Sequence, residues 1–243
     1  MRAPDLSVAG AICADLDSSP TPYHAVETVR VHLEASGFRP FAEDAGPAGR
    51  WFHAEGGGII AWVVAEHHDA LSPLRIVGAH TDSPNLRIKP QPDVSTLGVA
   101  QLGVEVYGGA LTNSWLDRDL GLAGRVVVRS GDGLQVRLVR DDRPLLRVPQ
   151  LAIHLDAEFR SSGLNLNRQR HMVPMWGLGE APAFRDYLAD QLSVGADDVV
   201  SWDMMAHDLS PARLAGLDDA FLVSSRLDNQ LSCFVATLSL IHI

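Results

Sequence analysis

A short apolar run that ends in a polar loop occurs at two distant places in this sequence. Residues 74–79 (LRIVGA) lead directly into His80-Thr81-Asp82-Ser83-Pro84, and Phe221-Leu222-Val223 is followed closely by Asp228. Short apolar runs bounded by turn residues are typical of buried strands, and open α/β sheets bind their ligands at the carboxyl ends of such strands. The pattern therefore predicts one α/β domain, in which a single sheet presents both polar segments at one edge.

The first ninety residues have the alternation of helix and strand that an α/β domain requires. Apolar residues recur at helical spacing over residues 5–35, with a break at residues 18–22 that contains two prolines, and Gly37 ends the second helix. Residues 51–53, 58–64 and 74–79 are short apolar runs that suit buried strands. We expect these strands to form a sheet covered by helices on both faces.

A β-rich stretch separates the two α/β parts. Strand patterns occupy residues 103–109, 122–128 and 134–139, and the sequence SGDG at residues 130–133 predicts a hairpin turn between the last two. One helix is predicted at residues 183–192, with Phe184, Tyr187, Leu188 and Leu192 on a single face. We predict one α/β domain formed by residues 1–92 and 218–243, with a β-rich insertion at residues 93–217.

Charge and composition exclude several classes of partner. The formal charge is −10, from 30 acidic and 20 basic residues, and this argues against nucleic acid because phosphate binding requires a basic surface. No apolar stretch approaches the roughly 20 residues of a membrane span, and no secretory signal pattern precedes the first helix. We therefore expect no nucleic-acid or membrane partner and a cytoplasmic location.

His80, Asp82 and Asp228 are the candidates for a metal site. Neutral imidazole is a good zinc ligand, and an aspartate two residues along an extended chain points to the same side, where it can orient the imidazole. Asp228 has two open interpretations, since it can ligate a metal or cap the helix that is expected to start at Asn229.

Other polar residues have structural interpretations beside functional ones. His154 can be a core histidine or a substrate contact. Asp117 and Asp119 flank Arg118, and this alternation favours an ion-paired turn over a catalytic acid and base pair. After Asp228 an apolar helix continues to Ile243 without a polar cap, so we expect part of the α/β domain to be missing from this chain.

Five blocks in order resemble the aspartyl aminopeptidase family of two-zinc metallopeptidases. They are GAHTDSP (78–84), EVYGG (105–109), WLDRDL (115–120), PQLAIHL (149–155) and SRLDN (225–229). The resemblance implies a zinc-peptidase fold of the phosphorylase/hydrolase type, interrupted by a β-rich dimerisation domain. It also implies a homo-oligomer that binds peptide substrates.

The same resemblance implies roles for individual residues. His80 would be the terminal ligand of one zinc ion, Asp228 the carboxylate that bridges both ions, and Asp82 the catalytic-site carboxylate that orients His80. His154 would contact substrate in the active site of a neighbouring subunit. The expected reaction is attack of an activated water on a peptide carbonyl, with a glutamate as general base.

The resemblance implies an aminopeptidase that removes N-terminal residues, with a preference for aspartate or glutamate. The glutamate base and the remaining metal ligands of the family have no counterparts in this chain, so we expect the 243-residue chain to be inactive by itself. Two alternatives remain open. One is a non-catalytic assembly fragment, and the other is a two-zinc amidohydrolase acting on acylated amino acids.

Overall fold

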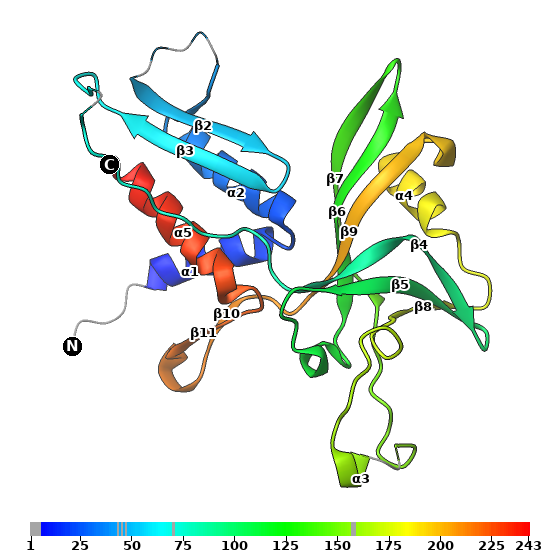
Figure 1. Cartoon of the computed structure of the whole chain (residues 1–243). Coiled ribbons are helices and arrows are strands. Elements are labelled where there is room, and N and C mark those ends of the chain that lie inside the picture. Colours follow the sequence, from blue (N-terminus) through cyan, green and yellow to red (C-terminus); the bar gives the residue numbers. More distant parts are fainter. Residues whose placement is uncertain (1–5, 43, 45, 47, 70, 157–158) are drawn as a thin grey trace. The chain divides into compact units, whose positions relative to one another are not determined.

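A computed structural model of the chain describes residues 6–42, 44, 46, 48–69, 71–156 and 159–243. The described chain divides into two compact units (Figure 1). Unit 1 combines the residues up to Ser83 with Pro211–Ile243, and unit 2 is Pro84–Ser210. The sequence placed the insertion at 93–217. The unit boundaries fall earlier because the strand Asn85–Thr96 pairs within unit 2, whereas Arg213–Ala215 pairs with Phe221–Val223 in unit 1.

Unit 1 begins with the helices that the sequence predicts. They are α1 (Leu6–Ser18) and α2 (Pro22–Ala35), and Asp5, the first residue of the predicted range, lies outside the described residues. Thr21 starts α2, because its hydroxyl accepts a hydrogen bond from the backbone N–H of His24 and Pro22 occupies the first turn. Among the described residues, no helix has the length and apolar character needed to cross a bilayer.

The remaining elements of unit 1 form small sheets and a terminal helix. They are β1 (Arg39–Pro40), β2 (Gly49–Glu55), β3 (Gly58–Val64), β10 (Arg213–Ala215), β11 (Phe221–Val223) and α5 (Leu227–Ile241). β2 pairs in parallel with β1 and antiparallel with β3, and β10 pairs antiparallel with β11.

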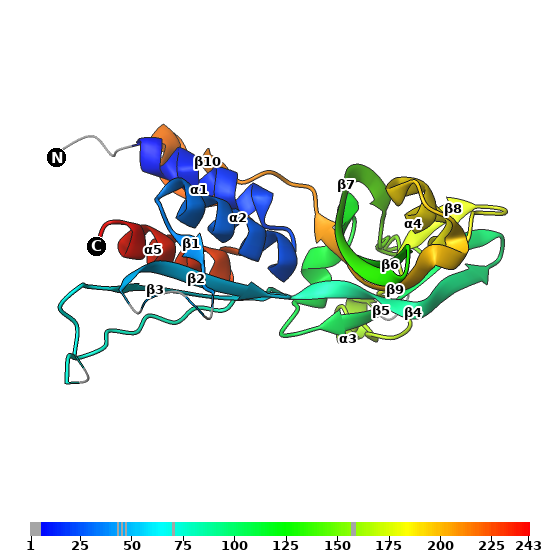
Figure 2. The same cartoon turned by 90° about the horizontal axis from the view of Figure 1, so that it is seen from above.

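The helices of unit 1 lie on one face of the β1–β2–β3 sheet (Figure 2). Leu33 from α2 and Phe52 from β2 are almost fully buried there with Phe38, and Leu240 and Ile241 of α5 pack against them. The expectation of helices on both faces is wrong for the described part of the chain. The burial pattern agrees, because no residue of β3 is fully buried and its first four residues alternate between exposed and half-buried.

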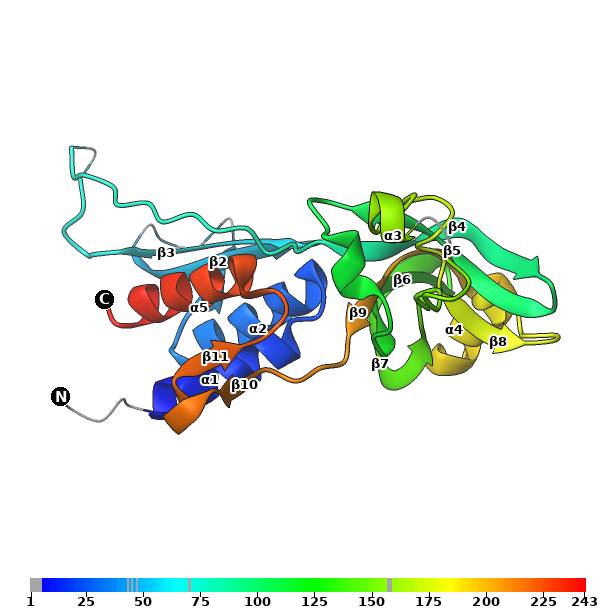
Figure 3. The ribbon, with the colours of Figure 1, turned by 90° about the horizontal axis from the view of Figure 1, so that it is seen from below.

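Residues 74–79 do not form the predicted strand. They have no regular secondary structure, and the side chains of Leu74, Ile76 and Val77 are 76%, 87% and 72% exposed. An apolar run becomes a strand only when another strand pairs with its backbone, and the structure places no strand beside this segment among the residues that it describes. Figure 3 shows the segment as an extended loop running along the β3 side of the sheet.

Unit 2 is the β-rich part that the sequence predicts. Its strands are β4 (Asn85–Thr96), β5 (Val99–Tyr107), β6 (Leu120–Ser130), β7 (Gly133–Leu146), β8 (Met175–Leu178) and β9 (Val199–Asp208). They form a sheet in the order β7-β6-β9-β4-β5-β8, and every neighbouring pair is antiparallel. The predicted hairpin is confirmed, since Ser130 pairs with Gly133 across the turn between β6 and β7.

Helix α4 (Phe184–Leu192) packs on this sheet and confirms the predicted helix. The four residues predicted to share a face, Phe184, Tyr187, Leu188 and Leu192, are all buried in the same core cluster as the strands. A short helix, α3 (Phe159–Ser162), lies in the long loop between β7 and β8. The core of unit 2 is thus formed by residues of that unit alone.

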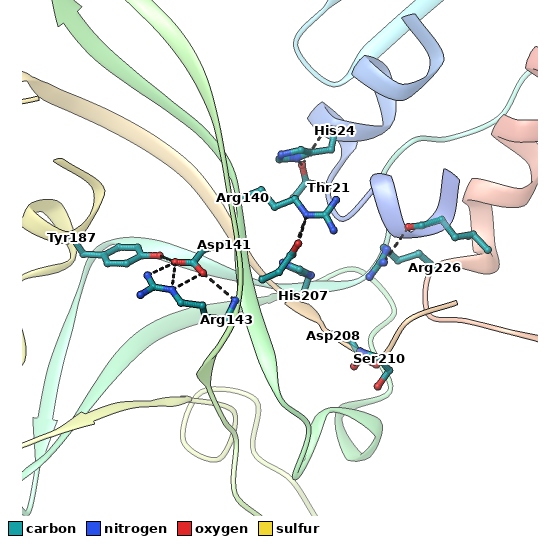
Figure 4. A network of polar contacts seen from close by, with 12 residues as sticks. Thr21, His24, Arg140, Asp141, Arg143, Tyr187, His207, Asp208, Ser210 and Arg226 are labelled. Carbon is teal, nitrogen blue, oxygen red and sulfur yellow. Dashed lines mark hydrogen bonds and ion pairs between the residues drawn. The ribbon is translucent and has the colours of Figure 1, made fainter. Parts of the chain in front are cut away.

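A buried polar network joins α4 to β7. Asp141 of β7 is 7% exposed, and it accepts hydrogen bonds from the Tyr187 hydroxyl at 2.8 Å and from the Arg143 Nε at 3.0 Å (Figure 4). The backbone N–H of Arg143 donates to the same carboxylate. These donors, the Arg143 guanidinium first, lower the pKa of Asp141 to about 2 against the opposing effect of burial.

Candidate metal centre

His80, Asp82 and Asp228 lie together in unit 1. The Nε2 atom of His80 is 3.1 Å from the Oδ1 atom of Asp228, and its Nδ1 atom is 2.9 Å from the backbone oxygen of Asp82 and 3.3 Å from the Asp82 Oδ1 atom. The side chains of His80 and Asp228 are 51% and 90% exposed, so the group is open to solvent. The expected convergence of His80 with Asp228 across the insertion is therefore present in the structure.

The surroundings of His80 favour a positive charge on the ring. Burial lowers the pKa of His80, but the hydrogen bond to the Asp82 carbonyl and the charges of Asp82 and Asp228 outweigh burial and raise the pKa above 6.5. Oxygen acceptors thus face both ring nitrogens. The Nδ1 hydrogen bond leaves Nε2 as the nitrogen that can lose its proton to a divalent cation, with the Asp228 carboxylate beside it.

Helix α5 holds the segment that carries His80. The side-chain amide of Gln230 donates to the carbonyl of Thr81 at 2.6 Å, and the thiol of Cys233 donates to the carbonyl of His80 at 3.3 Å. Gln230 and Cys233 are 6% and 8% exposed. Ser83 adds a bond from its hydroxyl to the backbone oxygen of Asp228 at 3.2 Å. These contacts fix the backbone of residues 80–83 against the helix that carries Asp228.

The way in which His80 and Asp228 meet differs from the prediction. We expected one sheet to present both residues at its carboxyl edge, but residues 74–79 form no strand, and β11 belongs to a separate sheet with β10. The contact with α5 joins the two residues instead. The backbone of Asp228 and Asn229 is not helical at the start of α5, no side chain makes a capping hydrogen bond there, and the Asp228 carboxylate contacts His80 instead.

His154 belongs to unit 2. It is exposed and lies in the loop between β7 and β8, next to Leu151, Ile153 and Leu155, whose side chains are also exposed. The interpretation of His154 as a core histidine is therefore wrong. Its role as a substrate contact in a neighbouring subunit stays a prediction.

The residues of the WLDRD block are ion-paired, as the sequence suggested. Their partners come from elsewhere in unit 2, since Arg118 pairs with Asp208, and Arg147 lies 2.6 Å from Asp119 and 3.8 Å from Asp117. The network links the loop before β6 to β9 and to the end of β7, and it is exposed except at Asp208, which is buried.

Zinc fits the chemistry of the donors at His80 but needs more of them. An imidazole nitrogen and a carboxylate are ordinary zinc ligands, and the carbonyl bound to Nδ1 of His80 is the usual outer partner of a ligating histidine. Zinc sites use about four donors. Among the described residues no group of three or more His, Cys, Asp or Glu side chains is arranged to hold a metal ion. His80 and Asp228 are thus suited to form part of a zinc site.

The sequence interpretation missed Gln230 and Cys233 as residues that position the candidate centre. Their signal is spacing: Gln230 and Cys233 are three residues apart on α5, so they lie on the same face of the helix. A glutamine on the apolar side of a helix needs a hydrogen-bond partner, and here the partner is the backbone next to His80.

Comparison with known proteins agrees with these observations. Residues 16–243 match the family model described as aminopeptidase I zinc metalloprotease (M18). The chain is 50% identical over 231 residues to a probable M18 family aminopeptidase 2 from Streptomyces coelicolor, covering 93% of this chain and 53% of that protein. A protein of the same name from Mycobacterium leprae is 45% identical over 240 residues, covering 96% and 56%. The chain therefore spans about half the length of these relatives.

Solved structures give the same result for the fold. A chain in the cryo-EM structure of the Ape4 and Nbr1 complex has a TM-score of 0.90 at 34% identity, over 97% of this chain and 50% of that one. The mApe1 structure from Chaetomium thermophilum has a TM-score of 0.88 at 28% identity, over 97% and 58%. The family match, the identities and the fold agree, and the chain belongs to the M18 family of zinc metalloaminopeptidases.

Proposed function

We propose that this chain supplies one part of the active centre of a zinc aminopeptidase, with His80 and Asp228 as metal ligands and Asp82 as the residue that orients His80. The observation that supports this most directly is the 3.1 Å approach of His80 Nε2 to Asp228 Oδ1, between segments on opposite sides of the insertion. An ordinary surface ion pair has no such support. Here Gln230 and Cys233 donate hydrogen bonds to the backbone carbonyls of Thr81 and His80, and these bonds hold His80 beside Asp228.

The roles of the residues follow from their contacts. Zinc, when bound, polarises the peptide carbonyl and activates water, and the family resemblance implies two ions with Asp228 bridging them. His80 would offer Nε2 to one ion, while its Nδ1–H donates a hydrogen bond to the Asp82 backbone carbonyl and so fixes the ring orientation. The Asp82 carboxylate, 3.3 Å from Nδ1, would raise the basicity of the ring. N-terminal aspartate or glutamate is the proposed substrate residue, on the same resemblance.

The chain by itself should lack activity. His80 and Asp228 supply two donors, whereas a zinc ion needs about four, and removal of a general base alone lowers rates by about two to four orders of magnitude. The described residues place no glutamate side chain in contact with His80 or Asp228. The complete enzyme would then need the portion of the relatives that this chain does not match.

Unit 2 would serve assembly. A structural relative, mApe1 of S. cerevisiae, is described as a dodecamer, and the family resemblance assigns dimerisation to the inserted domain. We propose that His154, exposed in its loop with apolar neighbours, enters the active site of another subunit of a cytoplasmic homo-oligomer. The self-contained core of unit 2 would equally serve a non-catalytic assembly fragment, so activity must decide between these functions.

The test compares the chain alone with a chimera. The 243-residue chain, purified with zinc or cobalt, is assayed on aspartyl and leucyl amide substrates, and we expect rates at background. Appending the unmatched part of the Streptomyces coelicolor relative should restore activity, with the aspartyl substrate preferred. His80→Ala should abolish that activity, whereas His53→Ala, which removes an exposed histidine of β2, should preserve it. Chelator-sensitive turnover by the short chain, or an active His80→Ala chimera, would refute the assignment.

A further inference from the structure

Strand β7 exposes a row of apolar side chains on one face. Leu134, Val136 and Leu138 are 65%, 58% and 42% exposed. The alternate residues point to the other face, where Val139 and Asp141 are buried and Arg137 donates to the backbone oxygen of Leu192 at the end of α4. The row is therefore the outer face of a strand whose inner face is already packed.

The row also lies at the edge of the sheet. β7 is the terminal strand in the order β7-β6-β9-β4-β5-β8, and β6 is its ladder partner in the described part of unit 2. Opposite Val136, β6 contributes Val127, which is half-buried and extends the apolar area. Proteins usually protect a long edge strand with charges or bulges, because an exposed apolar edge pairs readily with another chain. Here the outward positions 134, 136 and 138 carry no charge.

We propose that the edge of β7 pairs with β7 of a second copy, antiparallel and about a two-fold axis at Val136. In this register Val136 faces Val136 of the second copy, and Leu134 faces Leu138. A two-fold interface requires a surface that complements itself. The row meets this condition because leucines lie two residues before and two residues after the central valine.

The charges beyond the leucines complement each other in the same register. Asp132 lies four residues before Val136, in the hairpin turn, and Arg140 lies four residues after it, so each Asp132 comes opposite an Arg140 of the second copy. Both residues are exposed, and the ion-pair partner of Arg140 in the described part of the chain is its near neighbour Asp142, at 2.9 Å. Moving the axis by one residue in either direction places a charged residue opposite a leucine. Charge and apolar pattern therefore select the same axis.

This inference deepens the proposed self-association of unit 2 and identifies the surface that carries it. The continuous sheet would run from β8 of one copy through both β7 strands to β8 of the other. It does not depend on zinc, on His80 or on substrate. The assembly can therefore be tested in the 243-residue chain without a catalytic assay.

Cysteine substitution tests the register. In a Cys13→Ser background, Val136→Cys should form a disulfide-linked dimer under mild oxidation, because directly opposed antiparallel residues have Cβ atoms about 4.5–5.5 Å apart. Leu134→Cys alone should not, since its equivalent in the second copy lies about four residues away along the strand, at about 3.3 Å per residue. Leu134→Cys combined with Leu138→Cys should cross-link. Cross-linking by Leu134→Cys alone, or none by Val136→Cys, would overturn the proposed pairing.

Light scattering over a dilution series tests the association itself. The wild-type chain should dimerise, and Val136→Lys should be monomeric with an unchanged circular dichroism spectrum, because this side chain is exposed. Asp132→Arg and Arg140→Asp should each weaken the dimer, and the double variant should restore it. A monomeric wild type, an undiminished Val136→Lys dimer, or no recovery in the double variant would refute the proposal. An inactive chimera with an intact dimer would instead count against the aminopeptidase function alone.

Discussion

Asp141→Asn should destabilise unit 2, and the lowered pKa of the Asp141 carboxyl gives the size of the effect. The wild-type carboxylate is buried and held ionised by Arg143, by the Arg143 backbone and by Tyr187, so its pKa falls from 3.8 to about 2 on folding (Figure 4). One pKa unit corresponds to 1.36 kcal/mol, so the native carboxylate contributes about 2 kcal/mol of stability at neutral pH. The amide keeps the shape of the side chain but removes the charge.

The pH dependence follows from the sign of this pKa change. A lowered native pKa means that the stabilisation is complete above about pH 4 and is lost as the pH falls through about 2. Urea unfolding of the wild type and of Asp141→Asn, followed by circular dichroism from about pH 2 to about pH 7, measures this dependence of stability on pH. Wild type should be about 2 kcal/mol more stable at neutral pH, and the two curves should converge in acid.

A neighbouring residue provides the control. Asp142 is one position further along β7 and is 53% exposed; it pairs with Arg140 at 2.9 Å and lies 3.6 Å from His207. Because its carboxylate stays in contact with water, Asp142→Asn should change stability by less than about 1 kcal/mol. Equal stability of Asp141→Asn and wild type at pH 7, or the same loss of stability in acid for both, would refute the stabilising role of this network.

Further predictions concern the candidate metal centre. In metal-free protein, histidine NMR should show a His80 pKa above 6.5, and Asp228→Asn should lower that pKa. Zinc binds only the neutral ring. Binding of zinc or cobalt should therefore weaken as the pH falls through the pKa of His80. A His80 pKa that ignores Asp228→Asn would contradict the observed contact. Gln230→Leu should cost about 1 kcal/mol and accelerate hydrogen exchange near Thr81, whereas Gln169→Leu, which removes an exposed glutamine of unit 2, should leave that exchange unchanged.

Local patterns in the sequence predicted the elements that depend on local interactions. Helices α1, α2 and α4 follow from apolar spacing, and the β6–β7 hairpin follows from its glycine-containing turn. The apolar run at residues 74–79 has an equally good strand pattern and yet forms no strand. The difference is that a hairpin strand has its partner adjacent in sequence, whereas residues 74–79 depend on a partner from a distant segment.

In the candidate centre, too, some features could be predicted from local sequence and others depend on contacts between distant segments. The chemistry of His80, Asp82 and Asp228 could be predicted from residue type and motif order, and their convergence is observed. The contacts that bring these residues together could not be predicted, because they depend on which face of α5 packs against residues 80–83. Gln230 and Cys233 determine that contact, and their partners are backbone carbonyls that no side-chain motif reveals.

The placement of the insertion gives the two units different folding histories. Unit 2 is one uninterrupted segment, Pro84–Ser210, so a ribosome can deliver it complete before the last part of unit 1 has been made. Helices α1 and α2 emerge early, but their packing partner α5 follows only after the whole of unit 2. At about 5–20 residues per second, the roughly 200 residues between the end of α2 and the end of α5 take about 10–40 seconds to synthesise. The surface of α1 and α2 that packs against α5 is therefore exposed throughout that interval, and exposed apolar surface of this kind favours aggregation during synthesis.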